Sequence, residues 1–121
     1  MRIGMSRRTG TDAKPFAADI RSAVEGVEQG WPGELDTLCC GALGAVEFLC
    51  EAAPMLARND LRDLASRRLL GVLEAAAARG DYRWNSGPQR FNLSLFRGLA
   101  GVGYAALRQV DRSMPNVLIW E

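Results

Sequence analysis

The chain of 121 residues contains no histidine, so it lacks the commonest general base and the commonest metal ligand. It has three cysteines, and an odd number argues against a disulfide framework. Its formal net charge of +1 gives no sign of a nucleic-acid partner. Its apolar runs are far shorter than the roughly 18 residues needed to cross a bilayer, and no hydrophobic segment follows the basic start. We therefore expect a cytoplasmic protein without a signal peptide that is not an integral membrane protein.

Four segments have the apolar spacing or the composition of helices, at about 12–29, 40–56, 59–79 and 95–110. The first and third carry one apolar stripe each, which is typical of a helix with one exposed face. The second and fourth are apolar almost all round, which predicts burial on most sides. The sequence therefore predicts a single all-α domain over 1–121, in which amphipathic outer helices alternate with apolar inner helices.

Two segments lack helical patterns. Residues 111–121 are predicted to form an extended C-terminal tail that packs on the surface, and the polar, turn-rich stretch 81–94 is predicted to be a loop. The loop is either a solvated connector in which Trp84 or Phe91 packs on the core, or it contacts a peptide substrate. The residues that would make such contacts are Arg83, Trp84, Gln89 and Arg90.

An internal repeat links the two apolar segments, which read LCCGALGAVEFL from Leu38 and LFRGLAGVGYAAL from Leu95. A leucine and two glycines recur at a constant offset of 57. This pattern predicts a tandem of helical hairpins, in which the glycines permit sharp turns and close approach of inner helices. The motif glycines are Gly41 and Gly44 in the first copy and Gly98 and Gly101 in the second.

Cys39 and Cys40 are adjacent at the predicted start of the second helix, where the helix dipole favours the thiolate that binds zinc. Three interpretations are open: buried packing, a redox pair, or ligands for a soft metal. Cys50 lies about 15 Å further along the same helix and is expected in the core. Two thiols are too few for zinc, and Asp36 and Glu47 are the only local carboxylates that could add to them. Asp36 better suits a turn or cap.

These stretches resemble a known family. The sequence DTLCCGALGAVEFL is similar to the zinc motif of the lanthionine synthetase C-like cyclases, and its Cys-Cys-Gly resembles that of the type II (LanM-type) lanthipeptide synthetases. The stretch from Leu95 resembles the last inner helix of their C-terminal cyclase domain, and MPNVLIWE from Met114 resembles the end of those chains. The resemblance extends over most of residues 3–121.

The resemblance implies an α/α toroid of seven helix pairs, of which this chain would form an incomplete arc. It implies a zinc-dependent reaction that adds cysteine thiols of a precursor peptide to dehydroamino acids, giving thioether rings. By motif position, Cys39 and Cys40 would be two of the three zinc ligands, and Gly41 would allow the tight turn beside them. Phe96 and Arg97 stand in the corresponding places of the second copy, which would bind no metal.

The chain also departs from the family pattern. The family's first zinc cysteine belongs to a Trp-Cys-His-Gly-x-Pro-Gly-Ile-Gly motif, of which only Arg2-Ile3-Gly4 resembles the end. The acid–base histidine has no counterpart, so we assign no catalytic residue. We expect a C-terminal fragment of a cyclase domain, incomplete alone, whose partner is a precursor peptide or an upstream synthetase segment. The alternatives are a non-catalytic helical module that binds a peptide or partner, and a degenerate gene product.

Overall fold

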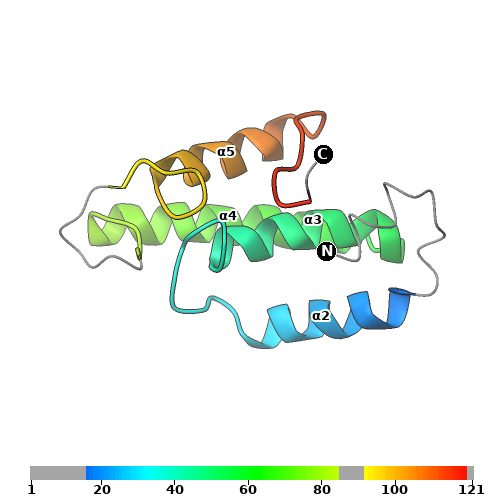
Figure 1. The fold of residues 1–121 in the computed structure, drawn as a ribbon. Helices are drawn as coiled ribbons and strands as arrows, with labels where there is room; N and C mark the ends of the chain where they lie inside the picture. The colour runs from blue at the N-terminus through cyan, green and yellow to red at the C-terminus, as the bar shows by residue number, and fades with distance from the viewer. Residues whose placement is uncertain (1–15, 85–91, 120–121) are drawn as a thin grey trace.

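The computed structural model describes residues 16–84 and 92–119. This part of the chain is all-helical and contains no strand, which confirms the predicted fold class. The elements are α2 (Ala17–Gln29), α3 (Ala42–Leu56), α4 (Asp60–Arg79) and α5 (Leu99–Val110), as Figure 1 shows.

The two apolar helices begin later than predicted. Gly41 and Gly98, which immediately precede α3 and α5, have extended backbones with φ of −125° and −141°. An extended residue ends the helical hydrogen-bond pattern, so the residues before each glycine form a turn instead. The predicted third helix coincides with α4, and the predicted start of the first helix lies outside the described residues.

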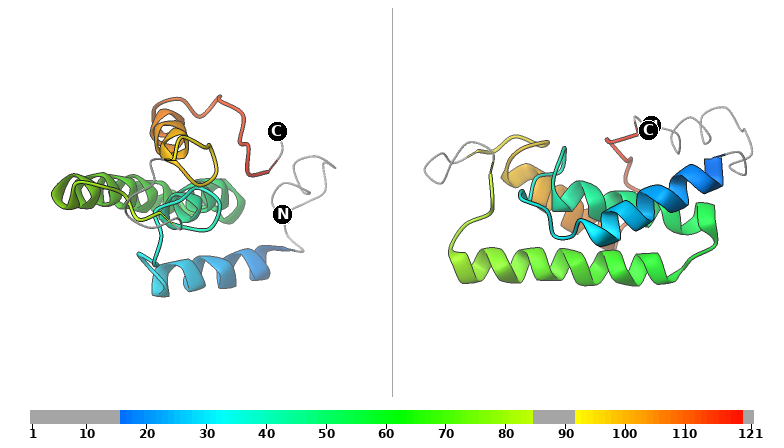
Figure 2. Two further views of the ribbon diagram at one scale, coloured as in Figure 1. Left: turned by 60° about the vertical axis from the view of Figure 1, so that its left-hand side comes forward. Right: turned by 90° about the horizontal axis from the view of Figure 1, so that it is seen from below.

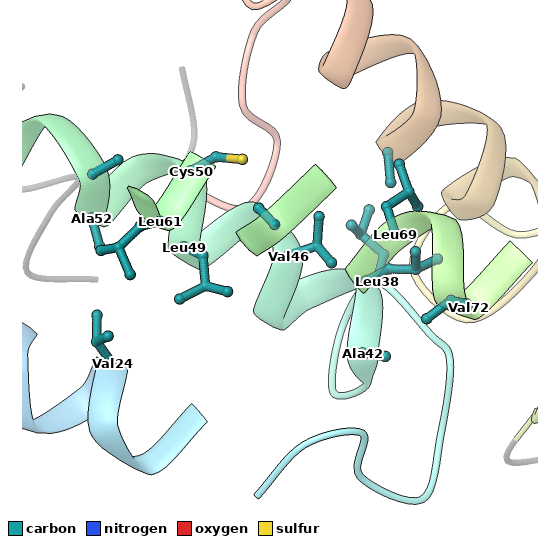
Figure 3. Packing of buried hydrophobic residues seen from close by; sticks show 14 of the residues in the cluster. Val24, Leu38, Ala42, Val46, Leu49, Cys50, Ala52, Leu61, Leu69 and Val72 are labelled. Carbon is teal, nitrogen blue, oxygen red and sulfur yellow. The ribbon is translucent and has the colours of Figure 1, made fainter. Parts of the chain in front are cut away.

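Helix α3 is the centre of the structure, because it packs against α2, α4 and α5. Helices α2 and α5 lie on opposite sides of it (Figures 1 and 2). The predicted burial of this apolar segment is confirmed, since α3 supplies the middle of the core (Figure 3). Among its fully buried apolar residues are Leu43, Val46, Leu49, Ala52 and Ala53.

Helix α5 differs from its prediction. Its buried face consists of Gly101, Val102, Ala105 and Arg108, whereas its opposite face is open. The side chains of Leu107 and Val110 are 58% and 89% exposed. The prediction that this segment is buried on most sides is therefore wrong for the described chain, because α3 covers only one side of it.

The C-terminal segment after α5 folds back against α3 and α5. The Tyr104 hydroxyl donates a hydrogen bond to the Pro115 carbonyl at 2.7 Å and accepts one from the Val117 N–H at 3.0 Å. Asn116 is buried and donates to Glu51 Oε1 at 3.0 Å. The tail thus reaches the core rather than only the surface. Within the described ranges, no helix is long and apolar enough to cross a membrane.

Candidate metal-binding site

The two copies of the repeat build the same turn. In the first copy the Ala42 N–H donates to the Leu35 carbonyl at 2.8 Å, and in the second the Leu99 N–H donates to the Asn92 carbonyl at 2.7 Å. Donors and acceptors are related by the sequence offset of 57. The internal repeat is therefore also a repeat of structure, in which a turn leads into an apolar helix.

The first glycine of each copy is required by this turn. A Cβ on Gly41 would lie 2.5 Å from the Leu35 carbonyl oxygen, and a Cβ on Gly98 would lie 2.2 Å from that of Asn92. Both contacts are to backbone, which cannot rotate away. Only a residue without a side chain lets the chain pass so closely over the start of the helix.

The second glycine of each copy also makes a close approach. A Cβ on Gly44 would lie 2.5 Å from the Leu38 carbonyl oxygen, and one on Gly101 would lie 2.2 Å from that of Leu95. The same Cβ on Gly101 would lie 3.2 Å from the Leu38 Cβ, so this glycine also brings the two copies together. The repeat motif thus encodes both the turns and their contact.

The two turns lie side by side, with the Cys39 N–H donating to the Phe96 carbonyl at 2.9 Å (Figure 1). Cys39 and Cys40 occupy the first turn, ahead of α3 rather than within it, and both are exposed. Their Sγ atoms are 2.7 Å apart, so the two side chains point the same way. The interpretation of this pair as buried packing is therefore wrong.

The electrostatic environment of the Cys40 thiol favours its protonated form. The pKa of the Cys40 thiol lies above its ordinary value, chiefly because it shares a hydrogen bond with Cys39. The charge of Arg97 lowers this pKa in part. The expected stabilisation of thiolate by the helix N-terminus is not the dominant effect here. A metal that binds the pair has to displace protons, so its affinity rises with pH.

Neither of the two carboxylates considered from the sequence completes a metal site. Asp36 is 1% exposed and accepts hydrogen bonds from the Arg83 backbone N–H at 2.8 Å and from its Nε at 3.0 Å. It also forms ion pairs with Arg83 and Arg79, at 2.6 and 3.0 Å. Within the described parts of the chain, no group of three histidine, cysteine or acidic residues is placed to hold a metal. The thiol pair suits zinc chemically but supplies only two of the ligands that zinc requires.

Glu47 belongs to a buried ionic network that the sequence analysis missed. Arg108 is 2% exposed and donates from Nε to Glu47 at 3.0 Å and from an Nη to Glu51 at 2.8 Å. Arg112 adds a second donor to Glu47 at 3.0 Å. The available signal was that two acidic residues of one apolar segment face an arginine in the other copy. Opposite charges on two inner helices predict a cross-helix ion pair.

Cys50 is buried, which confirms its placement in the core (Figure 3). Its sulfur nevertheless has polar neighbours, since Gln109 donates to Sγ at 3.4 Å and Arg112 also contacts it. Burial raises the pKa of the Cys50 thiol, although the Gln109 hydrogen bond and the Arg112 charge oppose the shift. Cys50 is thus separate from the exposed pair in environment as well as in sequence.

Two of the four loop residues considered for peptide contact have structural roles. Arg83 is bound to Asp36, and Trp84 donates to Asp81 at 3.0 Å while packing on the core. The connector interpretation holds for these two. Gln89, Arg90 and Phe91 lie outside the described residues.

Comparison with known proteins decides the family. The family model described as lanthionine synthetase C-like protein matches residues 5–119. The chain belongs to the lanthionine synthetase C-like family. A search of curated proteins and a search of solved structures gave no match. The matched range includes both copies of the repeated turn.

Proposed function

We propose that this lanthionine synthetase C-like chain is part of a zinc-dependent lanthipeptide cyclase and corresponds to the C-terminal portion of a type II (LanM-type) cyclase domain. The complete cyclase would add cysteine thiols of a precursor peptide to dehydroamino acids and form thioether rings. The observation that carries this proposal is the exposed Cys39–Cys40 pair in the hydrogen-bonded turn before α3, in a chain of the lanthionine synthetase C-like family.

The residues of this chain would hold and orient the ion. Zinc, when bound, lowers the pKa of a coordinated peptide thiol and keeps it as a nucleophilic thiolate. Cys39 and Cys40 would provide two ligands, and the hydrogen bond from Cys39 to the Phe96 carbonyl would fix their turn. The chain has no histidine that could exchange a proton with the substrate. We propose that an upstream synthetase segment supplies the remaining ligand and the acid–base group.

The arrangement of helices supports the proposed arc of an α/α toroid. Helices α3 and α5 begin with equivalent turns and pack on each other, as neighbouring inner helices of a toroid would. Helices α2 and α4 pack on α3 and would be outer helices. The open face of α5, with Leu107 and Val110, would contact helices of the upstream segment.

A reconstitution experiment tests this function. The chain would be combined with an upstream cyclase segment and a dehydrated precursor peptide, and ring formation would be followed as loss of alkylatable peptide thiols by mass spectrometry. We expect zinc-dependent ring formation that Cys39→Ser or Cys40→Ser reduces at least tenfold, consistent with loss of a metal ligand. Cys50→Ala is the matched control and should retain activity. If the Cys39 and Cys40 variants formed rings as fast as the unsubstituted chain, the proposal would be contradicted.

A pocket of about 520 Å³ supports a second candidate, a peptide-binding module that needs no metal. Its walls are mostly apolar and include Ile20 and Phe48 together with Leu118 of the tail. Glu47 also lines it, and its Oε1 is buried with no hydrogen-bond partner among residues 16–84 and 92–119. A ligand with an apolar body and one hydrogen-bond donor would fit this lining.

The two candidates make opposite predictions for peptide affinity. If binding depends on the pocket alone, serine at both Cys39 and Cys40 leaves the affinity for the precursor peptide unchanged, whereas Phe48→Ala weakens it. If the thiol pair and its metal bind the peptide, serine at Cys39 and Cys40 weakens the affinity for the peptide, whereas Phe48→Ala leaves it unchanged. Isothermal titration calorimetry of the two variants with one precursor peptide distinguishes the candidates.

A further inference from the structure

The pocket between α2, α3 and the C-terminal segment carries charges of one sign on its wall. Helix α3 contributes Glu47 and Glu51, which lie one turn apart on the same face of the helix, and α2 contributes Asp19. Among the described residues that line the pocket, there is no lysine or arginine. Most of the remaining wall is apolar, with Ile20 and Phe48. The wall therefore disfavours an anion and favours an apolar molecule that carries a positive charge.

The two carboxylate oxygens of Glu47 have different surroundings. Arg108 donates from Nε to Oε2 at 3.0 Å, and Arg112 donates from an Nη to the same oxygen at 3.0 Å. Neither arginine lines the pocket. Oε1 is buried and has no hydrogen-bond partner within residues 16–84 and 92–119. A buried carboxylate oxygen without a donor is costly, so a ligand that supplies the donor binds more favourably than it would at an exposed oxygen.

We propose that this pocket binds an organic ammonium group on an apolar body, which packs on Ile20, Phe48 and Leu118 while its nitrogen donates to Glu47 Oε1. The volume of about 520 Å³ lies within the range of small-molecule sites. The inference rests on the pocket of the second candidate function and names the chemical group that the pocket recognises. It needs neither the thiol pair nor a metal.

A ligand reaches Oε1 through a small change in the wall. Glu47 is fully buried, whereas Phe48 and Leu118 are only partly buried. Rotation of these two side chains exposes the carboxylate, while the backbone of the C-terminal segment stays in place. Hydrogen bonds of the buried Asn116 side chain and of the Tyr104 hydroxyl hold that segment. The segment thus forms one wall of the site.

Titration of the chain with phenethylamine, followed by NMR chemical shifts, tests the inference. We expect saturable binding with a dissociation constant in the millimolar range, as befits a ligand of so few atoms. Phenethyl alcohol has the same body with a neutral donor and should bind about tenfold more weakly, because a charge-assisted hydrogen bond is stronger than a neutral one. Phenylpropionate, an anion, should not bind. Equal affinities for the amine and the alcohol would overturn the ammonium assignment.

Substitutions in α2 test the location without disturbing the buried ionic network. Ala23 is exposed and lines the pocket, so Ala23→Leu adds atoms within the ligand volume and should weaken phenethylamine binding about tenfold. Ala18→Leu, at an exposed position of the same helix outside the lining, is the matched control and should leave the affinity unchanged. Equal affinities of the Ala23 and Ala18 variants would overturn the assigned pocket.

Glu47→Gln tests the acceptor itself and should abolish the preference for the amine over the alcohol. If loss of its pairs with Arg108 and Arg112 unfolds this variant, the Ala23 variant and the ligand series still decide. A preference that persists in a folded Glu47→Gln variant would overturn the role of Oε1.

A peptide arm separates this inference from the proposed functions. A short peptide with one lysine should compete with phenethylamine more strongly than the same peptide with that lysine acetylated. Equal competition by the two peptides would overturn the ammonium assignment and still support a peptide-binding pocket. The cyclase proposal is decided by ring formation, which none of these titrations involves.

Discussion

Buried charges are the main residue-scale feature of this molecule. Asp36 and Glu47 are almost fully buried, and each is matched by two arginines. Breaking such a pair by removing one member is costly, because the remaining charge stays desolvated. The carboxylates therefore fix the positions of the segments that they join, and they are poor candidates for metal ligands.

Asp36→Ala should lower the free energy of unfolding by about 2–4 kcal/mol. The range is below that of a fully buried pair, because Arg79 and Arg83 are partly exposed and regain water. Urea denaturation followed by circular dichroism measures the change. Asp60→Ala, which breaks the exposed Arg58–Asp60 pair, is the matched control and should change stability little. Similar effects of the two substitutions would refute the role assigned to Asp36.

Cys50 should make stability depend on alkaline pH. Burial raises the pKa of its thiol in the folded protein, whereas the unfolded chain ionises it above about pH 8.5. The unfolded state then binds fewer protons, so stability falls as pH rises through this region towards the folded-state pKa. Cys50→Ala should flatten the dependence of the unfolding free energy on pH between about 8 and 10. Cys39 and Cys40 are present in both proteins, so the comparison isolates Cys50, and an unchanged slope would contradict the assignment.

At the scale of elements, the sequence predicts which segments are helices but not where the apolar ones begin. Apolar composition continues through the turns at 38–40 and 95–97, so periodicity cannot separate turn from helix. The boundary is set instead by backbone contacts of Gly41 and Gly98 that involve residues six positions earlier. The glycine spacing indicated these close approaches, whereas composition alone did not.

The sequence predicted which residues form the candidate site but not that their side chains are exposed. The adjacent thiols were visible in the sequence, yet an apolar context favoured burial. Cys39 and Cys40 lie in a turn that is hydrogen-bonded to Phe96, 57 residues after Cys39, and single-sequence patterns do not encode such a pairing. For Arg108 the opposite charges of the two apolar segments indicated an ion pair, but its buried geometry with Glu47 and Glu51 on another helix was visible only in the structure.

Alanine at the turn glycines should destabilise the fold, and alanine at open helical glycines should stabilise it. Gly41→Ala and Gly98→Ala place a Cβ against backbone atoms, which should cost about 1–3 kcal/mol. Gly71 lies within α4, and a Cβ at this position would meet no other atom within 4 Å. Gly71→Ala should therefore add about 0.5–1 kcal/mol. Chemical denaturation of the three variants measures their free energies of unfolding. Equal changes in all three would show that the repeated turn does not require glycine.

At the scale of the whole molecule, the described helices form an open array rather than a closed one. Stacked helical repeats require polar outer faces at both ends of the array to remain soluble. Helix α5 lies at one side of the array (Figure 2). The side chains of its Leu107 and Val110 are exposed to solvent. Its apolar face is therefore suited to contact with further helices, and it makes the isolated chain prone to association.

Replacing Leu107 and Val110 together by glutamine should reduce aggregation of the isolated chain without lowering its free energy of unfolding. Both side chains are exposed, so the substitution removes no buried contact, and light scattering against concentration measures the effect. Leu70→Gln on α4 is the matched control, since Leu70 is exposed but lies on an amphipathic helix, and it should change scattering less. The double variant should also bind an upstream cyclase segment less tightly, because the same face would form that interface. Unchanged scattering and unchanged binding would show that the exposed face of α5 is not an interface for further helices.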